Sequence, residues 1–96
     1  MPDSVPQELA DLRRQIDAVD AELLRLLASR LELVLAVGEL KRALRLAVYD
    51  PERERDLLAR LASSAPSPLE PALVRRVFER IVDESRSAEQ RRTGAR

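Results

Sequence analysis

Hydrophobic residues recur at alternating steps of three and four along residues 7–44. This spacing places side chains on one stripe of a helix and is typical of helices that pack along a common seam. The pattern predicts one helix of about 38 residues, which would be about 57 Å long at 1.5 Å per residue. The seam consists of Leu9, Leu12, Ile16, Val19, Leu23, Leu26, Leu33, Val37, Leu40 and Leu44.

A single chain of this size cannot cover both ends of such a helix. The 96 residues indicate one small domain over residues 1–96, and such a domain has a radius of gyration of only about 12–13 Å. We therefore expect a second chain to bury the seam, in an obligate dimer or higher oligomer. The polar ends, residues 1–6 and 91–96, are expected to be flexible.

Two shorter helices follow the long one. Residues 45–50 break the repeat, and Asp50-Pro51-Glu52 has the residue types that begin a helix, which predicts a second helix over 51–63. A third helix is expected to start between Ser67 and Pro71, with Ser67 and Glu70 as a capping box. The sequence thus predicts an all-α chain with one very long helix and two shorter ones.

Composition narrows the classes of function. Lys plus Arg and Asp plus Glu both number 17, so the net charge is zero, which argues against a general nucleic-acid binder. The absence of Cys and His excludes thiolate chemistry and removes the commonest general base and metal ligand. No apolar run is long enough for a bilayer, and Met1-Pro2-Asp3-Ser4 lacks a signal core. We expect a cytoplasmic protein that binds no membrane.

Arg30 occupies a seam position. The equivalent positions seven residues before and after it are the aliphatic Leu23 and Val37. A guanidinium within an apolar stripe is costly unless an anion pairs with it. That anion is either a carboxylate of the protein or a ligand. Lys41 follows three turns later on the same side, about 16 Å along the axis, so the two cations could hold a small dianion between them.

Arg13 lies too far along the same helix, about 42 Å from Lys41, to share a site within one chain. In an antiparallel dimer whose helices cross near the middle of the rod, residue 13 of one chain meets roughly residue 36 of the other. That point falls between Arg30 and Lys41. The symmetry would create two identical sites, each with an Arg13 from the second chain.

These polar residues also have ordinary structural uses. Arg13 and Lys41 flank the seam, where charges commonly form salt bridges between chains. Arg53 opposes the helix dipole in a first turn, so helix stability alone would not select it, although it also suits a solvated surface. Helix caps and polar helix ends would equally explain Asp50, Glu54, Ser85 and Glu89.

Gly38 stands inside the long helix, at a cost of about 1 kcal/mol relative to Ala. The close approach of another backbone or of a ligand would explain a glycine at this position. The alternative interpretation is that Gly38 weakens the helix shortly before its end.

Several segments taken together resemble the all-helical AroQ-type chorismate mutase family, over about residues 8–90. The resemblance implies an intertwined antiparallel homodimer of three-helix chains. It also implies the rearrangement of chorismate, a dianion, to prephenate in phenylalanine and tyrosine biosynthesis, with no metal or cofactor. It is also compatible with an association with another shikimate-pathway enzyme. The segments are Leu12-Arg13-Arg14-Gln15-Ile16-Asp17, Leu26-Leu27-Ala28-Ser29-Arg30, Val37-Gly38-Glu39-Leu40-Lys41 and Asp50-Pro51-Glu52-Arg53-Glu54.

The resemblance assigns the cationic residues to the substrate. Arg30 and Arg53, with Arg13 from the second chain, would hold the two carboxylates. Lys41 would bind a carboxylate and the breaking ether oxygen. A pericyclic rearrangement needs no nucleophile or metal, so a chain without Cys and His suits it. What accelerates the reaction is a compact substrate conformer and positive charge at the ether oxygen.

The resemblance also assigns the remaining polar residues. Glu54 and the backbone of Asp50 would hold the substrate hydroxyl, and Ser85 would lie beside the ring carboxylate. Family members often carry a glutamine four residues after this serine, where the present chain has Glu89. We hypothesise that Lys41, Arg30 and Glu89 are the catalytic residues. Glu89 would act as a neutral acid, because burial would raise its pKa. Alternatively, the helix shifts by one residue and Gln90 takes its place.

Two other functions remain open on the same residues. An isochorismate pyruvate-lyase would use a similar scaffold and cationic site, although the complete Arg53-Glu54 pair favours the mutase. A helical dimerisation or regulatory module without activity is the third interpretation, and it predicts that Arg30 pairs with a carboxylate of the protein.

Overall fold

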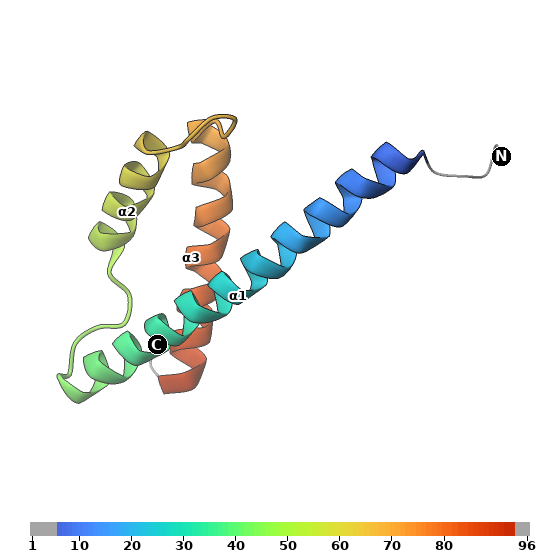
Figure 1. The fold of residues 1–96 in the computed structure, drawn as a ribbon. Coiled ribbons are helices and arrows are strands. Elements are labelled where there is room, and N and C mark those ends of the chain that lie inside the picture. Colours follow the sequence, from blue (N-terminus) through green and yellow to red (C-terminus); the bar gives the residue numbers. More distant parts are fainter. Residues whose placement is uncertain (1–5, 94–96) are drawn as a thin grey trace. The chain divides into compact units, whose positions relative to one another are not determined.

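The computed structural model describes residues 6–93 of the chain, and within this range it contains three helices and no strand (Figure 1). They are α1 (Gln7–Ala43), α2 (Pro51–Ser63) and α3 (Pro71–Thr93). The predicted all-α class, with one long and two shorter helices, is confirmed. The ends expected to be flexible lie largely outside the described residues, while residues 91–93 form the last part of α3.

The chain divides into two compact units, residues 1–32 and 33–96. The first unit contains the N-terminal part of α1. The second unit contains the C-terminal part of α1, the loop 44–50, α2 and α3. None of the helices within the described range is long and apolar enough to cross a membrane.

The seam of α1 is open to water in the single chain. The exposed fraction of its ten apolar side chains ranges from 40% at Leu9 to 69% at Leu33. Soluble proteins rarely leave so long an apolar stripe exposed unless another surface covers it. The seam therefore has the character of an interaction surface.

The sequence Asp50-Pro51 defines the start of α2, as predicted. The Asp50 carboxylate accepts a hydrogen bond of 3.1 Å from the backbone N–H of Arg53, which satisfies one of the free donors at the helix start. Pro51 occupies the first helical position, where its missing N–H costs nothing. The helix ends at Ser63, and the Ser64 hydroxyl donates to the Arg60 carbonyl at 2.9 Å.

The capping box expected at Ser67 and Glu70 is wrong, because α3 begins only at Pro71. A residue that precedes proline is disfavoured in the helical region, so Glu70 remains outside the helix. Its carbonyl nevertheless accepts the first helical hydrogen bond, from the N–H of Val74 at 3.0 Å.

Helices α2 and α3 pack side by side in the second unit (Figure 1). Their contact buries Ala62 of α2 with Val74 and Val82 of α3, and Val48 of the preceding loop is buried as well. These small side chains make a modest core.

Candidate active site

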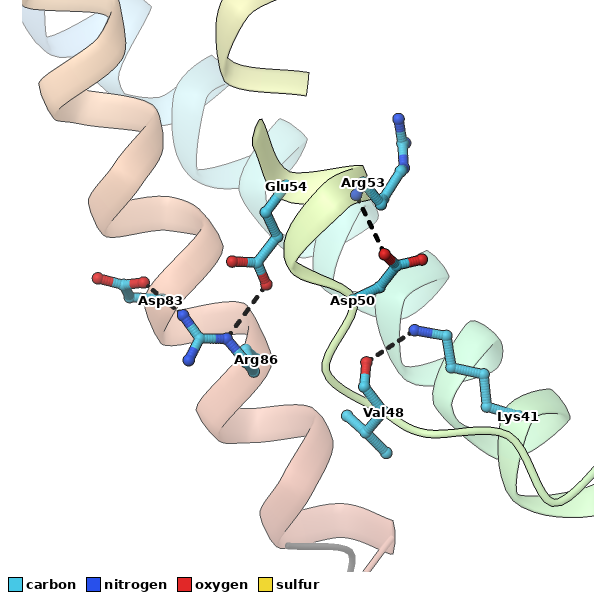
Figure 2. A network of polar contacts seen from close by, with 7 residues as sticks. All are labelled: Lys41, Val48, Asp50, Arg53, Glu54, Asp83 and Arg86. Atoms are coloured by element: carbon cyan, nitrogen blue, oxygen red, sulfur yellow. Dashed lines mark hydrogen bonds and ion pairs between the residues drawn. The ribbon is translucent and has the colours of Figure 1, made fainter. Parts of the chain in front are cut away.

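A polar cluster forms in the second unit where four segments meet: the last turns of α1, the loop 44–50, the first turn of α2 and the C-terminal half of α3. Figure 2 shows Lys41, Asp50, Glu54 and Arg86 of this cluster with their hydrogen bonds and ion pairs. The cluster consists of Lys41, Asp50, Glu54, Arg86 and Glu89.

Glu89 of α3 is the buried acid of this cluster, with 5% of its surface exposed. Its side chain fills the space beside Gly38 of α1, where a Cβ would lie 2.7 Å from the Glu89 Cγ and 3.1 Å from its Oε2. Another group does approach Gly38 closely, but it is the side chain of Glu89 in α3 and not the backbone or ligand expected from the sequence. Only glycine leaves this space open.

The surroundings of Glu89 shift its protonation. Burial raises the pKa of Glu89 above its ordinary value; the charge of Lys41 opposes this effect, and the carboxylate of Glu54 adds to it. A carboxyl group in this setting keeps its proton to higher pH than an exposed glutamate and can then donate a hydrogen bond. The neighbouring Gln90 is less buried than Glu89.

Lys41, partly buried near the end of α1, is held by the loop that follows. Its Nζ donates to the carbonyl of Val48 at 2.8 Å (Figure 2). The backbone carbonyl of Lys41 accepts from the N–H of Leu46 at 2.7 Å. An ammonium group has three donors, so Lys41 can serve a further acceptor while Val48 fixes its position.

Arg86 joins α3 to α2. Its Nε donates to Glu54 Oε2 at 3.1 Å and its Nη2 to Asp83 Oδ1 at 2.7 Å (Figure 2). Its guanidinium carbon lies 4.7 Å from the centroid of the Tyr49 ring, a stacked cation–π arrangement. Arg86 was not among the predicted site residues, although it lies four residues after the buried Val82 and three before Glu89, on the same face of α3.

The structure thus brings Lys41, Glu54 and Glu89 together, three of the residues that the sequence predicted for the site. Asp50 stands beside them as the cap of α2. Ser85 is partly buried one turn before Glu89.

The predicted arginines are placed differently. Arg53 is exposed, and in Figure 2 its side chain extends away from Lys41 and Arg86. Arg13, exposed, and Arg30, partly buried, belong to the first unit. Their share in a common site remains a prediction. Within the described residues, no group of three or more acidic side chains is arranged to hold a metal ion.

Comparisons with known proteins give the same family. The family model described as chorismate mutase type II matches residues 12–90. A relative named T-protein, from Enterobacter agglomerans, is 47% identical over 83 residues, which is 85% of this chain. The chain spans only 22% of that relative's length.

Two solved structures resemble the chain over most of its length. A chorismate mutase from Thermus thermophilus matches with a TM-score of 0.85 and 38% identity, covering 88% of this chain and 97% of that one. A chorismate mutase from Helicobacter pylori, in complex with prephenate, matches with a TM-score of 0.80 and 31% identity, covering 88% of this chain and 91% of that one. The match over residues 12–90 includes every residue of the polar cluster, and the chain belongs to the chorismate mutase type II family.

Proposed function

We propose that this protein is a chorismate mutase, an isomerase that converts chorismate to prephenate. The observation that carries the proposal is the meeting of Lys41, Glu54 and Glu89 in one cluster, within a chain that belongs to this family. The Helicobacter pylori relative, crystallised with prephenate, supports the same product.

The reaction requires a compact substrate conformer and stabilisation of the negative charge that develops on the ether oxygen. The Lys41 ammonium, held by the Val48 carbonyl, would place positive charge there. A protonated Glu89 would add a second donor. Donors that are already oriented cost no rearrangement in the transition state. The Val48 carbonyl orients Lys41, and burial restricts Glu89.

The other polar residues would bind and orient the substrate. Glu54 and the backbone of Asp50 would hold the hydroxyl group, and Ser85 would lie beside the ring carboxylate. Arg30 and Arg53 would bind the two carboxylates of the dianion. Restricting the substrate in this way supplies the entropic part of the acceleration.

The exposed seam of α1 supports an intertwined antiparallel homodimer. Each apolar side chain that becomes fully buried contributes about 1.5–3 kcal/mol, and the seam offers ten of them. A two-fold axis across the seam would give two equal sites, each completed by Arg13 from the second chain.

We expect this enzyme in the cytoplasm. Since the chain spans only 22% of the T-protein relative, the matched domain occurs there within a longer protein. The present chain could likewise work next to a second enzyme domain, by association with another shikimate-pathway enzyme.

Purified protein incubated with chorismate tests the proposal. Loss of chorismate absorbance with formation of prephenate is the expected result. Formation of pyruvate from isochorismate would instead support the lyase. A chain that consumes neither compound would be a helical module without activity.

A further inference from the structure

Arg86 differs from the other arginines that form ion pairs in the described part of the chain. Its partner Glu54 lies 32 residues away on another helix, and the two side chains are only 28% and 22% exposed. Pairs such as Arg25–Glu22 and Arg80–Glu84 join residues three or four apart on one helix and are at least 60% exposed. Exposed pairs of that kind contribute little to stability.

Arg86 fixes three groups from separate parts of the second unit. Its Nε binds Glu54 in the first turn of α2, its Nη2 binds Asp83 one turn earlier on α3, and its planar face stacks on Tyr49 in the loop. A guanidinium offers several donors in a rigid fork together with a flat face, so one side chain can define all three positions.

We propose that Arg86 is a positioning residue that orients the Glu54 carboxylate and the adjoining loop for the substrate hydroxyl, an assignment that rests on the proposed function. The contact engages Oε2 of Glu54. A carboxylate has about four acceptor sites, so Oε1 keeps the capacity to accept from a hydroxyl group. Tyr49 directly precedes Asp50, whose backbone is the second group at that hydroxyl.

A double-mutant cycle of Arg86→Gln and Glu54→Gln tests this role. If Arg86 acts through Glu54, Arg86→Gln should lower kcat/KM by about 10- to 100-fold in the wild type, the scale of a displaced orienting group. In the Glu54→Gln background, the same change should lower kcat/KM by a clearly smaller factor, because only the contact with Tyr49 in the loop is then left to lose. Equal losses in both backgrounds would overturn the proposal.

Two further variants separate geometry from charge and from general stability. Arg80→Gln is the matched control, since Arg80 lies on the same helix with its own carboxylate partner, and it should leave kcat/KM unchanged. Arg86→Lys keeps the charge but loses the fork, so it should recover only part of the activity. Full activity in Arg86→Lys would show that orientation by the fork is not needed and would overturn the role.

Intrinsic fluorescence tests the Tyr49 contact without any turnover. The chain has one tyrosine and no tryptophan, so its emission reports on Tyr49. Quenching by acrylamide should increase in Arg86→Gln, because the ring loses its cover, and should not change in Arg80→Gln. Unchanged quenching in Arg86→Gln would refute the stacking.

A wild type that does not convert chorismate would overturn the proposed function itself. An active wild type, with equal losses from Arg86→Gln in both backgrounds of the double-mutant cycle, would remove only the role of Arg86.

Discussion

Glu89 of α3 lies against Gly38 of α1, so close that a Cβ on residue 38 would be 2.7 Å from the Glu89 Cγ. The glycine and the buried acid therefore depend on each other. One provides the space, and the other is buried because that space exists.

Gly38→Ala should displace the Glu89 side chain. We expect a loss of turnover with a free energy of unfolding lowered by about 1–3 kcal/mol from overpacking. In a Glu89→Ala background the collision is absent, and the same substitution should stabilise the chain by about 1 kcal/mol because Ala favours the helix. Thermal or urea unfolding of the four proteins measures this reversal. If Gly38→Ala changed the free energy of unfolding in the same direction in both backgrounds, that result would contradict the contact between Gly38 and Glu89.

The raised pKa of Glu89 predicts a pH dependence. If the protonated acid donates to the ether oxygen, turnover should fall as pH rises through the titration of Glu89, which lies above the ordinary value of 4.5. Glu89→Gln should make the profile flat while retaining activity. A flat profile in the wild type, or an unchanged one in Glu89→Gln, would count against the neutral acid.

The same shift affects stability. Because burial raises the pKa of Glu89 above its ordinary value of 4.5, the folded state binds this proton more tightly than the unfolded state. The stabilisation is fully present below 4.5 and is lost as pH rises through the folded pKa. As pH rises through this range, the free energy of unfolding of the wild type should fall relative to that of Glu89→Gln.

Lys41→Ala should nearly abolish turnover. Removing one preorganised donor typically lowers kcat by about 10²–10³-fold, and the variant also loses the hydrogen bond to the Val48 carbonyl. Arg42→Ala, in the same last turn of α1 and exposed, is the matched control and should remain active. Steady-state kinetics with a measurement of molecular mass checks both, and wild-type activity in Lys41→Ala would refute the assignment.

Mixing two inactive variants tests the shared site. Arg13→Ala and Lys41→Ala chains should each be inactive alone. In a mixed dimer, one site receives both substitutions and the other receives neither. Co-refolding at equal amounts should therefore restore about a quarter of the wild-type activity. No recovery, despite mixed dimers seen by native mass spectrometry, would show that Arg13 acts within its own chain, and an active Arg13→Ala variant would show that Arg13 has no role in the site.

Local patterns predicted the helices well. The repeat from Leu9 to Leu44 gives α1 to within one residue of its end, and Asp50-Pro51 gives the start of α2. These signals depend on neighbours three or four residues apart. The start of α3 was predicted only as the range from Ser67 to Pro71, because Pro71 disfavours a helical Glu70 and so competes with the capping pattern before it.

The candidate site could be predicted only in part. The family resemblance pointed to Glu89, four residues after Ser85, and the burial and raised pKa of Glu89 agree with the hypothesis of a neutral acid. The link between Arg86 and Glu54 spans 32 residues, and no local pattern encodes it, because it arises only when α2 and α3 pack. The placement of Arg13 and Arg30 at the site remains a prediction from resemblance.

The uncovered stripe of α1 also bears on how the chain reaches its native state. If a second copy covers this stripe, as proposed, a newly made chain exposes its longest helix to water until that copy binds, and the final folding step should accelerate with protein concentration. Dilution should then remove structure and catalysis together, rather than leaving an intact but idle subunit.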